Sequence, residues 1–144
     1  MHKIKKITTE SPAYQSVLLL RDLVLRKPLG MNLFDENLEG DKEEIIFGIF
    51  NENEEALASV QFKILDNLSV KLRQMAVHPE HQKKGLGKSL VQFAEQQIKN
   101  LGYKKIEMHA RKTAIPFYEK LGYKKEGDEF IEVGIPHYKM CKEL

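Results

Sequence analysis

The sequence predicts a mixed α/β fold in which a mostly antiparallel sheet is flanked by helices. Apolar residues alternate along three consecutive segments, and short runs of turn-forming residues join these segments. That pattern is typical of antiparallel strands connected as a meander. A segment with helical apolar spacing follows, and strand-like and helix-like segments then alternate again. The 144 residues are enough for one core, so a single domain over residues 1–144 is expected.

The N-terminal third should contain a strand, a helix and a long connection. A strand is predicted over residues 2–8. Ser11 can cap a helix that carries Pro12 in its first turn and ends before Pro28. Residues 28–43 form an acidic connection with scattered large apolar residues. Connections of this length in a compact domain are often functional, so this segment is a candidate binding element.

The remaining two thirds should supply the meander, a long helix and a closing group of strands. Gly102 stands where the C-terminal glycine of the long helix belongs. Strands are predicted over residues 44–50, 56–65, 68–77 and 103–110, helices over 86–101 and 113–121, and short closing strands over 123–125 and 138–141.

Composition narrows the partners and the compartment. A net charge of +2 is too small to indicate a nucleic-acid partner, and the basic residues are local. The single cysteine, Cys141, excludes an internal disulfide framework and suits a reducing compartment. No segment has the length and apolarity of a membrane span, and the N-terminus lacks the apolar core of a signal peptide. We therefore expect a soluble cytoplasmic protein without membrane or nucleic-acid partners.

The most informative segment is a glycine-bearing loop between a predicted strand and the long helix. Backbone N–H groups in a first helical turn lack intrahelical partners, and the helix dipole favours anions there. Glycines let a ligand approach the backbone closely, and lysines add positive charge. A cradle for a phosphate-bearing ligand is therefore one interpretation, and a turn that merely joins strand to helix is the other. The loop consists of Gln82, Lys83, Lys84, Gly85, Leu86, Gly87, Lys88 and Ser89.

Two familiar phosphate loops do not fit this segment. A Walker A loop ending at Ser89 would need glycine at position 82, where Gln82 stands. A dinucleotide fingerprint would need a third glycine at Leu90. The remaining pattern, Gln-x-x-Gly-x-Gly, resembles the acyl-CoA pyrophosphate loop of the GNAT superfamily of N-acetyltransferases.

The resemblance extends over most of the chain. Met75-Ala76-Val77-His78-Pro79 before the loop is similar to the strand that precedes it in GNAT proteins. The segment AIPFYEKLGY at residues 114–123 resembles the second GNAT signature, and together with GIPH at residues 134–137 it is similar to a bacterial subgroup. Arg111 departs from the family pattern, since many members carry asparagine or glutamine there.

The resemblance implies a splayed sheet and direct transfer of an acetyl group from acetyl-CoA to an amine. The splayed strand end at Met75, Ala76 and Val77 should offer backbone groups to the pantetheine arm, and the loop from Gln82 to Ser89 should wrap the pyrophosphate. Tyr118 matches the family tyrosine that protonates the leaving thiolate. Its alternative role is a packed aromatic ring. No metal ion is implied.

The sequence does not identify the general base or the acceptor. His109 and His137 are candidates for touching the acceptor, with Glu107 and Glu132 as further carboxylates, and a water chain is an alternative base. Cys141 is expected to be an inert packed thiol. The acidic connection would suit a cationic amine, or it is a solvated face.

Two other functions remain as alternatives. One is a non-catalytic acyl-CoA-binding sensor. The other is a nucleotide-binding module that uses Gly87, Lys88 and Ser89. The acceptor could be a small molecule or a peptide, and an edge strand near the C-terminus could pair with a second copy to form a homodimer.

Overall fold

A computed structural model describes residues 2–144, and all its strands join one seven-stranded sheet in the order β1-β2-β3-β4-β5-β7-β6. Every neighbouring pair is antiparallel except β4 and β5, which are parallel. The predicted mixed fold with a mostly antiparallel sheet is therefore confirmed. The strands are β1 (Lys3–Ile7), β2 (Ile45–Phe50), β3 (Ala56–Ile64), β4 (Ser69–Val77), β5 (Lys105–Arg111), β6 (Lys124–Glu132) and β7 (Ile135–Glu143).

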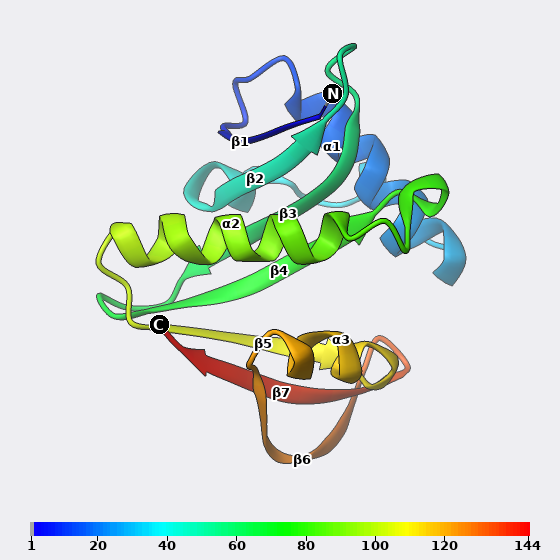
Figure 1. The fold of residues 1–144 in the computed structure, drawn as a ribbon. Helices are drawn as coiled ribbons and strands as arrows, with labels where there is room; N and C mark the ends of the chain where they lie inside the picture. The colour runs from blue at the N-terminus through cyan, green and yellow to red at the C-terminus, as the bar shows by residue number, and fades with distance from the viewer. Residues whose placement is uncertain (1) are drawn as a thin grey trace.

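Three α-helices cover the two faces of this sheet (Figure 1). Helix α2 (Leu86–Asn100) and the short α3 (Ile115–Lys120) pack into the larger apolar cluster with β2 to β5 and β7. Helix α1 (Tyr14–Arg21) packs on the opposite face, in a smaller cluster with β1 to β4. No helix within residues 2–144 has the length and apolarity needed to cross a bilayer.

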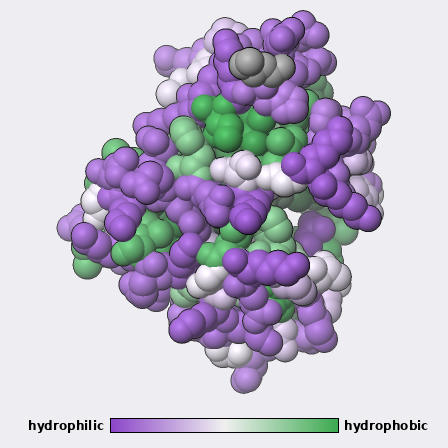
Figure 2. Space-filling view, viewed as in Figure 1, coloured by the Kyte–Doolittle hydropathy of each residue, from purple (hydrophilic) through white to green (hydrophobic). Residues whose placement is uncertain are grey.

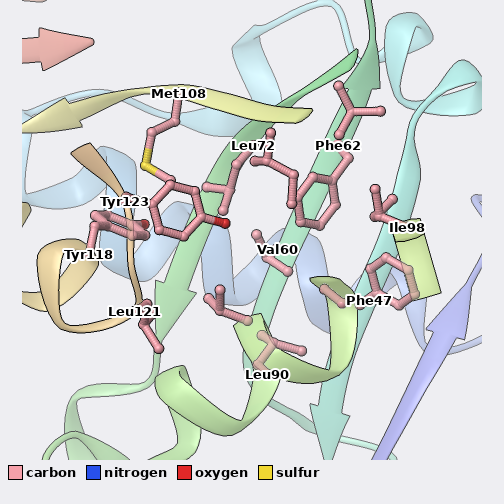
Figure 3. Close-up of a cluster of buried hydrophobic side chains, with 14 of the residues drawn as sticks. Phe47, Val60, Phe62, Leu72, Leu90, Ile98, Met108, Tyr118, Leu121 and Tyr123 are labelled. Atoms are coloured by element: carbon pink, nitrogen blue, oxygen red, sulfur yellow. The ribbon is translucent and has the colours of Figure 1, made fainter. Parts of the chain in front are cut away.

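The larger cluster runs from the meander to the closing strands (Figure 3). Phe47, Phe62 and Ile98 lie at one end of the close-up, and Tyr118 and Tyr123 lie at the other, beside Met108. The rings of Tyr118 and Tyr123 meet edge to face with centroids 5.7 Å apart. This core therefore fixes α3, and Tyr118 with it, against the sheet.

On the α2 side, polar side chains cover most of the surface, and hydrophobic side chains are seen in separate patches between them (Figure 2).

The meander and the long helix lie where the sequence predicts them, within one residue or so at each end. Gly102 ends the long helix with φ +101, as expected for a glycine at that position. The short helix predicted over residues 113–121 is a 3₁₀ turn, Lys112–Ala114, followed by α3.

The closing strands are longer than predicted. β6 and β7 have nine residues each, whereas the sequence suggested short strands at 123–125 and 138–141. β6 is an edge strand that is exposed along most of its length, so no apolar alternation marks it. The length of β6 is set by its pairing with β7, which the local residue pattern does not reveal.

The first helix also differs from its prediction. Ser11 does not cap it, because its Oγ accepts the N–H of Thr8 at 2.9 Å and α1 begins at Tyr14. Beyond Arg21 the chain continues as a π-helical turn, Asp22–Arg26, and then as a 3₁₀ turn that contains Pro28. The acidic connection is likewise a series of 3₁₀ turns, Lys27–Leu29, Leu33–Asp35 and Glu39–Glu43, rather than an irregular loop.

Candidate functional site

The sheet opens between its two parallel strands. β4 and β5 pair over only three residues, Ser69–Lys71 against Lys105–Glu107, and diverge beyond them (Figure 1). From Leu72 onward, the edge of β4 that faces β5 is therefore not part of a ladder with it. Backbone groups on such an edge can bind an extended ligand as a further strand would.

A bulge in β4 marks the same place. Gln74 has φ +53, and the register with β3 shifts so that Gln74 and Met75 together oppose Val60. The bulge reverses the alternation of side chains: Leu72 lies in the α2 cluster, whereas Ala76 lies in the α1 cluster. The predicted strand end of Met75, Ala76 and Val77 thus begins at this bulge.

The glycine loop enters α2 in a left-handed conformation. Gly85 precedes the helix with φ +77, and Lys83 has φ +65. The regular ladder begins at Ser89, whose N–H donates to the carbonyl of Gly85 at 3.0 Å, so the preceding N–H groups belong to the open first turn. Lys83, Lys84 and Lys88 are exposed. This is the backbone arrangement that favours an anion.

Gln82 and Gly87 have structural contacts of their own. The Gln82 Nε2 donates to the carbonyl of Val77 at 3.1 Å, which ties the loop to the end of β4. Gly87 is buried, and a Cβ on it would lie 3.3 Å from both Met75 Cε and Phe117 Cζ. Gly87 therefore lets α2 approach β4 and α3, which is an additional reason for glycine beside any contact with a ligand.

A cavity of about 570 Å³ occupies the opening between β4 and β5. Its walls come from β4 and β5, from α3 and the β6–β7 hairpin, and from the segment after α1. Met75, Tyr118, His109 and His137 all line it. The structure thus brings Met75 of the predicted strand end, the predicted acid and both candidate histidines to one cavity, whereas Ala76, Val77 and the loop from Gln82 to Ser89 do not line it.

Tyr118 reaches this cavity from the apolar side. Its side chain is 5% exposed and packs edge to face against Phe117, with ring centroids 5.0 Å apart. Its hydroxyl makes no hydrogen bond with any of residues 2–144. Burial raises the pKa of Tyr118 above its ordinary value, so the phenol stays protonated at neutral pH. It is a proton donor without a partner at the cavity wall.

His109 and His137 share one carboxylate. His109 Nδ1 lies 2.9 Å from one Glu132 oxygen, and His137 Nε2 lies 3.7 Å from the other. His137 Nδ1 donates to the carbonyl of Ile135 at 2.7 Å, which leaves Nε2 as the free nitrogen of its neutral form. Burial alone would raise the pKa of Glu132, but the hydrogen bond and charge of His109 bring it below the ordinary value.

These three side chains form a cluster of ionisable groups at the cavity wall. Within residues 2–144, no set of three His, Cys, Asp or Glu side chains is placed to hold a metal ion. Glu107 is not part of the group, because it pairs with Lys139 at 3.6 Å and does not line the cavity. A carboxylate between two imidazoles can hold one proton and pass it on.

Three of the five carboxylates in the acidic connection are paired, whereas Asp35 and Glu43 are exposed. Glu36 accepts from Arg26 at 2.6 Å, and Glu39 from Lys42 at 2.8 Å. Asp41 accepts from Arg21 at 2.7 Å. Each of these carboxylates is neutralised by a cation of the chain itself.

The last acidic residue of this region reaches toward the cavity. Glu44 binds Arg73, a cavity residue. Gln61 Nε2 bridges Asp41 and Glu44 at 3.0 and 3.1 Å. The network therefore connects α1 to the cavity wall and supports it.

Cys141 takes no part in the site. It is buried on β7, and burial raises the pKa of its thiol to about 11. A thiol with that pKa is a poor nucleophile at neutral pH. The sequence did not point to Arg26, Lys71 or Val133, which also line the cavity, because nothing in their local pattern distinguishes them from surface residues.

The fold and the sequence define an acetyltransferase. The sequence matches the acetyltransferase (GNAT) domain over residues 32–144, and the chain belongs to the GNAT family of N-acetyltransferases. The uncharacterized Bacillus subtilis (strain 168) protein YyaT is 30% identical over 98% of this chain and 95% of its own length.

Solved structures share the fold. Escherichia coli ElaA superposes with a TM-score of 0.83 at 19% identity, covering 99% of this chain and 100% of its own. A GNAT family acetyltransferase from Elizabethkingia anophelis, solved with acetyl-CoA bound, gives a TM-score of 0.73 at 19% identity over 99% of this chain and 98% of its own.

Proposed function

We propose that residues 1–144 form one acetyltransferase domain that moves an acetyl group directly from acetyl-CoA to an amine. The observation that carries this proposal is the cavity between β4 and β5, where Tyr118 and the His109–Glu132–His137 group meet at a sheet edge without a partner strand. Direct transfer is favoured because Cys141, the single cysteine, is buried outside the cavity. We also propose that the protein is cytoplasmic.

Acetyl-CoA should lie along the α2 side of the opening. The loop from Gln82 to Ser89 offers backbone N–H groups and three exposed lysines, which suit the pyrophosphate. The free edge of β4 beyond Leu72 offers N–H and carbonyl groups to the amide-containing pantetheine arm. An N–H group at the bulge can also stabilise the oxyanion that forms on the thioester.

The two proton transfers are assigned to opposite walls of the cavity. As the amine attacks the thioester carbon, its proton passes to the His109–Glu132–His137 group. The carbon–sulfur bond then breaks, and the Tyr118 hydroxyl gives its proton to the departing thiolate. A phenol with a raised pKa is protonated at the start, and it regains its proton from solvent after the product leaves.

Removing one oxygen atom tests this function. Tyr118→Phe keeps the ring that packs against Phe117 and Tyr123 and deletes only the proposed donor. We expect kcat to fall by about 10²–10⁴, which is the usual worth of a general acid, with little change in acetyl-CoA affinity or melting temperature. Stopped-flow detection of CoA release under single-turnover conditions measures this step.

The same variant separates an acid from a packing residue. The loss should shrink with acyl donors whose thiol is more acidic, since a better leaving group needs less protonation. Tyr123→Phe is the matched control, because Tyr123 is a buried tyrosine that packs against the Tyr118 ring but does not line the cavity. Equal single-turnover rates for Tyr118→Phe and the wild type would reduce Tyr118 to packing.

A further inference from the structure

The charged side chains of the cavity are unequally paired. Its lining contains four permanent cations, Arg26, Lys71, Arg73 and Arg111, and two carboxylates, Glu36 and Glu132. Arg26 donates two hydrogen bonds to Glu36, at 2.6 and 3.2 Å. Arg73 is paired with Glu44, a residue that does not line the cavity. Lys71 and Arg111 form no ion pair with any of residues 2–144.

The remaining carboxylate does not cancel both of these cations. Glu132 is shared by two imidazoles, and a proton on either one neutralises it. Lys71 Nζ lies 3.5 Å from His109 Nδ1, so its charge faces this group without a carboxylate of its own. The cavity therefore keeps an excess of positive charge beside the residues that handle the amine proton.

Lys71 contacts His109 from β4, and Arg111 is the next same-face residue after His109 on β5. Ile106, Met108 and Ala110 of β5 face the α2 cluster, so His109 and Arg111 project from the other face, as Lys71 does on β4. Adjacent same-face positions on a strand are separated by ~6.6 Å. An amine held at His109 can therefore carry a substituent that reaches Lys71 or Arg111 within a few bonds.

We propose that the acceptor carries an anionic group close to its reacting amine, as an amino acid or a phosphorylated amine does, and that Lys71 and Arg111 bind this group. The inference rests on the proposed function and names the substrate class of the same site. It excludes polyamines as preferred acceptors, because their additional ammonium groups would face Lys71 and Arg111, and the exposed carboxylates of the acidic connection, Asp35 and Glu43, do not line the cavity.

Matched acceptor pairs test the proposal. Phenylalanine is compared with phenylalaninamide, and O-phosphoethanolamine with ethanolamine, by calorimetric affinity for the protein saturated with CoA and by kcat/KM with acetyl-CoA. We expect the anionic member of at least one pair to bind about tenfold tighter or better. The pair with the larger preference distinguishes a carboxylate from a phosphate.

Substitutions then assign the preference to its residues. Lys71→Met should reduce it to threefold or less, and Lys71→Glu should invert it. Arg111→Gln should weaken it without abolishing acetyl-CoA binding. Lys63→Met is the matched control, since Lys63 lies in register with Lys71 on β3 but outside the cavity, and this variant should keep the wild-type preference.

Equal affinities within both pairs, or a preference that survives in the Lys71→Met/Arg111→Gln double variant, would overturn the inference. Turnover without preference leaves the acetyltransferase function standing and the inference false. A preference in binding with no turnover of any amine leaves the inference standing and the acetyltransferase function false, because calorimetry does not depend on catalysis.

Discussion

The two sides of the opening between β4 and β5 are built in different ways. The side toward α2 is formed by short contiguous segments: the strand end at Met75 and the helix that carries Tyr118 line the cavity, and the loop from Gln82 to Ser89, which does not line it, leads into α2. The opposite side is assembled from single residues of distant segments, from Arg26 to His137. The first side is mostly apolar packing with one phenol, whereas the second is a balance of charges.

This difference separates two kinds of binding. A contiguous loop with a left-handed glycine and an open first helical turn suits a ligand part that never varies, such as a pyrophosphate. In a wall of separate paired and unpaired side chains, a single substitution can change which acceptor binds. We therefore expect variants on the α2 side to change acetyl-CoA affinity and variants on the opposite side to change acceptor affinity.

The largest expected effect on stability comes from the network that supports the charged side. Asp41 and its partner Arg21 are almost completely buried, with side chains 7% and 2% exposed. Asp41→Asn leaves the Arg21 charge buried without its counter-ion, which typically costs about 3–5 kcal/mol. Urea unfolding of this variant and of Glu39→Gln provides the comparison. Glu39 lies in the same acidic connection but forms an exposed pair, so its loss should change little.

The same pair predicts how stability depends on pH. Burial alone would raise the pKa of Asp41, but hydrogen bonds from Tyr14 and Arg21 bring it below its ordinary value. The contribution of Asp41 is therefore complete above that ordinary value, near ~4, and is lost as the pH falls toward the lower folded-state pKa. If the wild type and Asp41→Asn lost stability in parallel below pH 4, the network would not hold Asp41 in its charged form.

A smaller effect is expected at the rim of the cavity. Val133 lines the cavity with φ +46, and Gly134 follows with φ +74, so a β-branched residue occupies a turn position that favours asparagine. Val133→Asn should raise the free energy of unfolding by about 1 kcal/mol by relieving this strain. It should also weaken acceptor binding, because an apolar part of the cavity wall is lost.

Glu54→Asn is the control for Val133→Asn. Glu54 also has a positive φ, +59, but it lies in the β2–β3 hairpin outside the cavity. Its replacement should leave KM for the acceptor unchanged. Unaltered acceptor KM and unaltered stability in Val133→Asn would show that this turn is neither strained nor part of the site.

The sequence predicts one side of the site far better than the other, for a physical reason. A helix N-terminus and its glycine are local features, so Gly85 and the open first turn are visible in eight consecutive residues. Likewise, the meander follows from local alternation and turn residues. The partnership of His109 with Glu132 instead depends on the pairing of β5, β7 and β6, and β6 has no apolar pattern of its own. Which cations remain unpaired depends on tertiary contacts such as Arg73 with Glu44.

Gly87 has a packing role in addition to the one that the loop pattern predicts. Its glycine is expected from the phosphate loop, yet its missing Cβ also makes room for Met75 and Phe117. Gly87→Val should therefore lower the melting temperature as well as acetyl-CoA affinity, whereas a loop residue with only a ligand contact would change affinity alone.

Ligand-induced thermal stabilisation tests the division between the two sides most directly. A ligand present at a hundred times its Kd should stabilise the fold by ~2.7 kcal/mol. Acetyl-CoA should produce a stabilisation of this size in the wild type and equally in Lys71→Met, and a much smaller one at the same concentration in Gly87→Val. ATP with magnesium should produce none. Stabilisation by ATP–magnesium instead of acetyl-CoA, or an acetyl-CoA effect lost in Lys71→Met and kept in Gly87→Val, would contradict the assignment of the two sides.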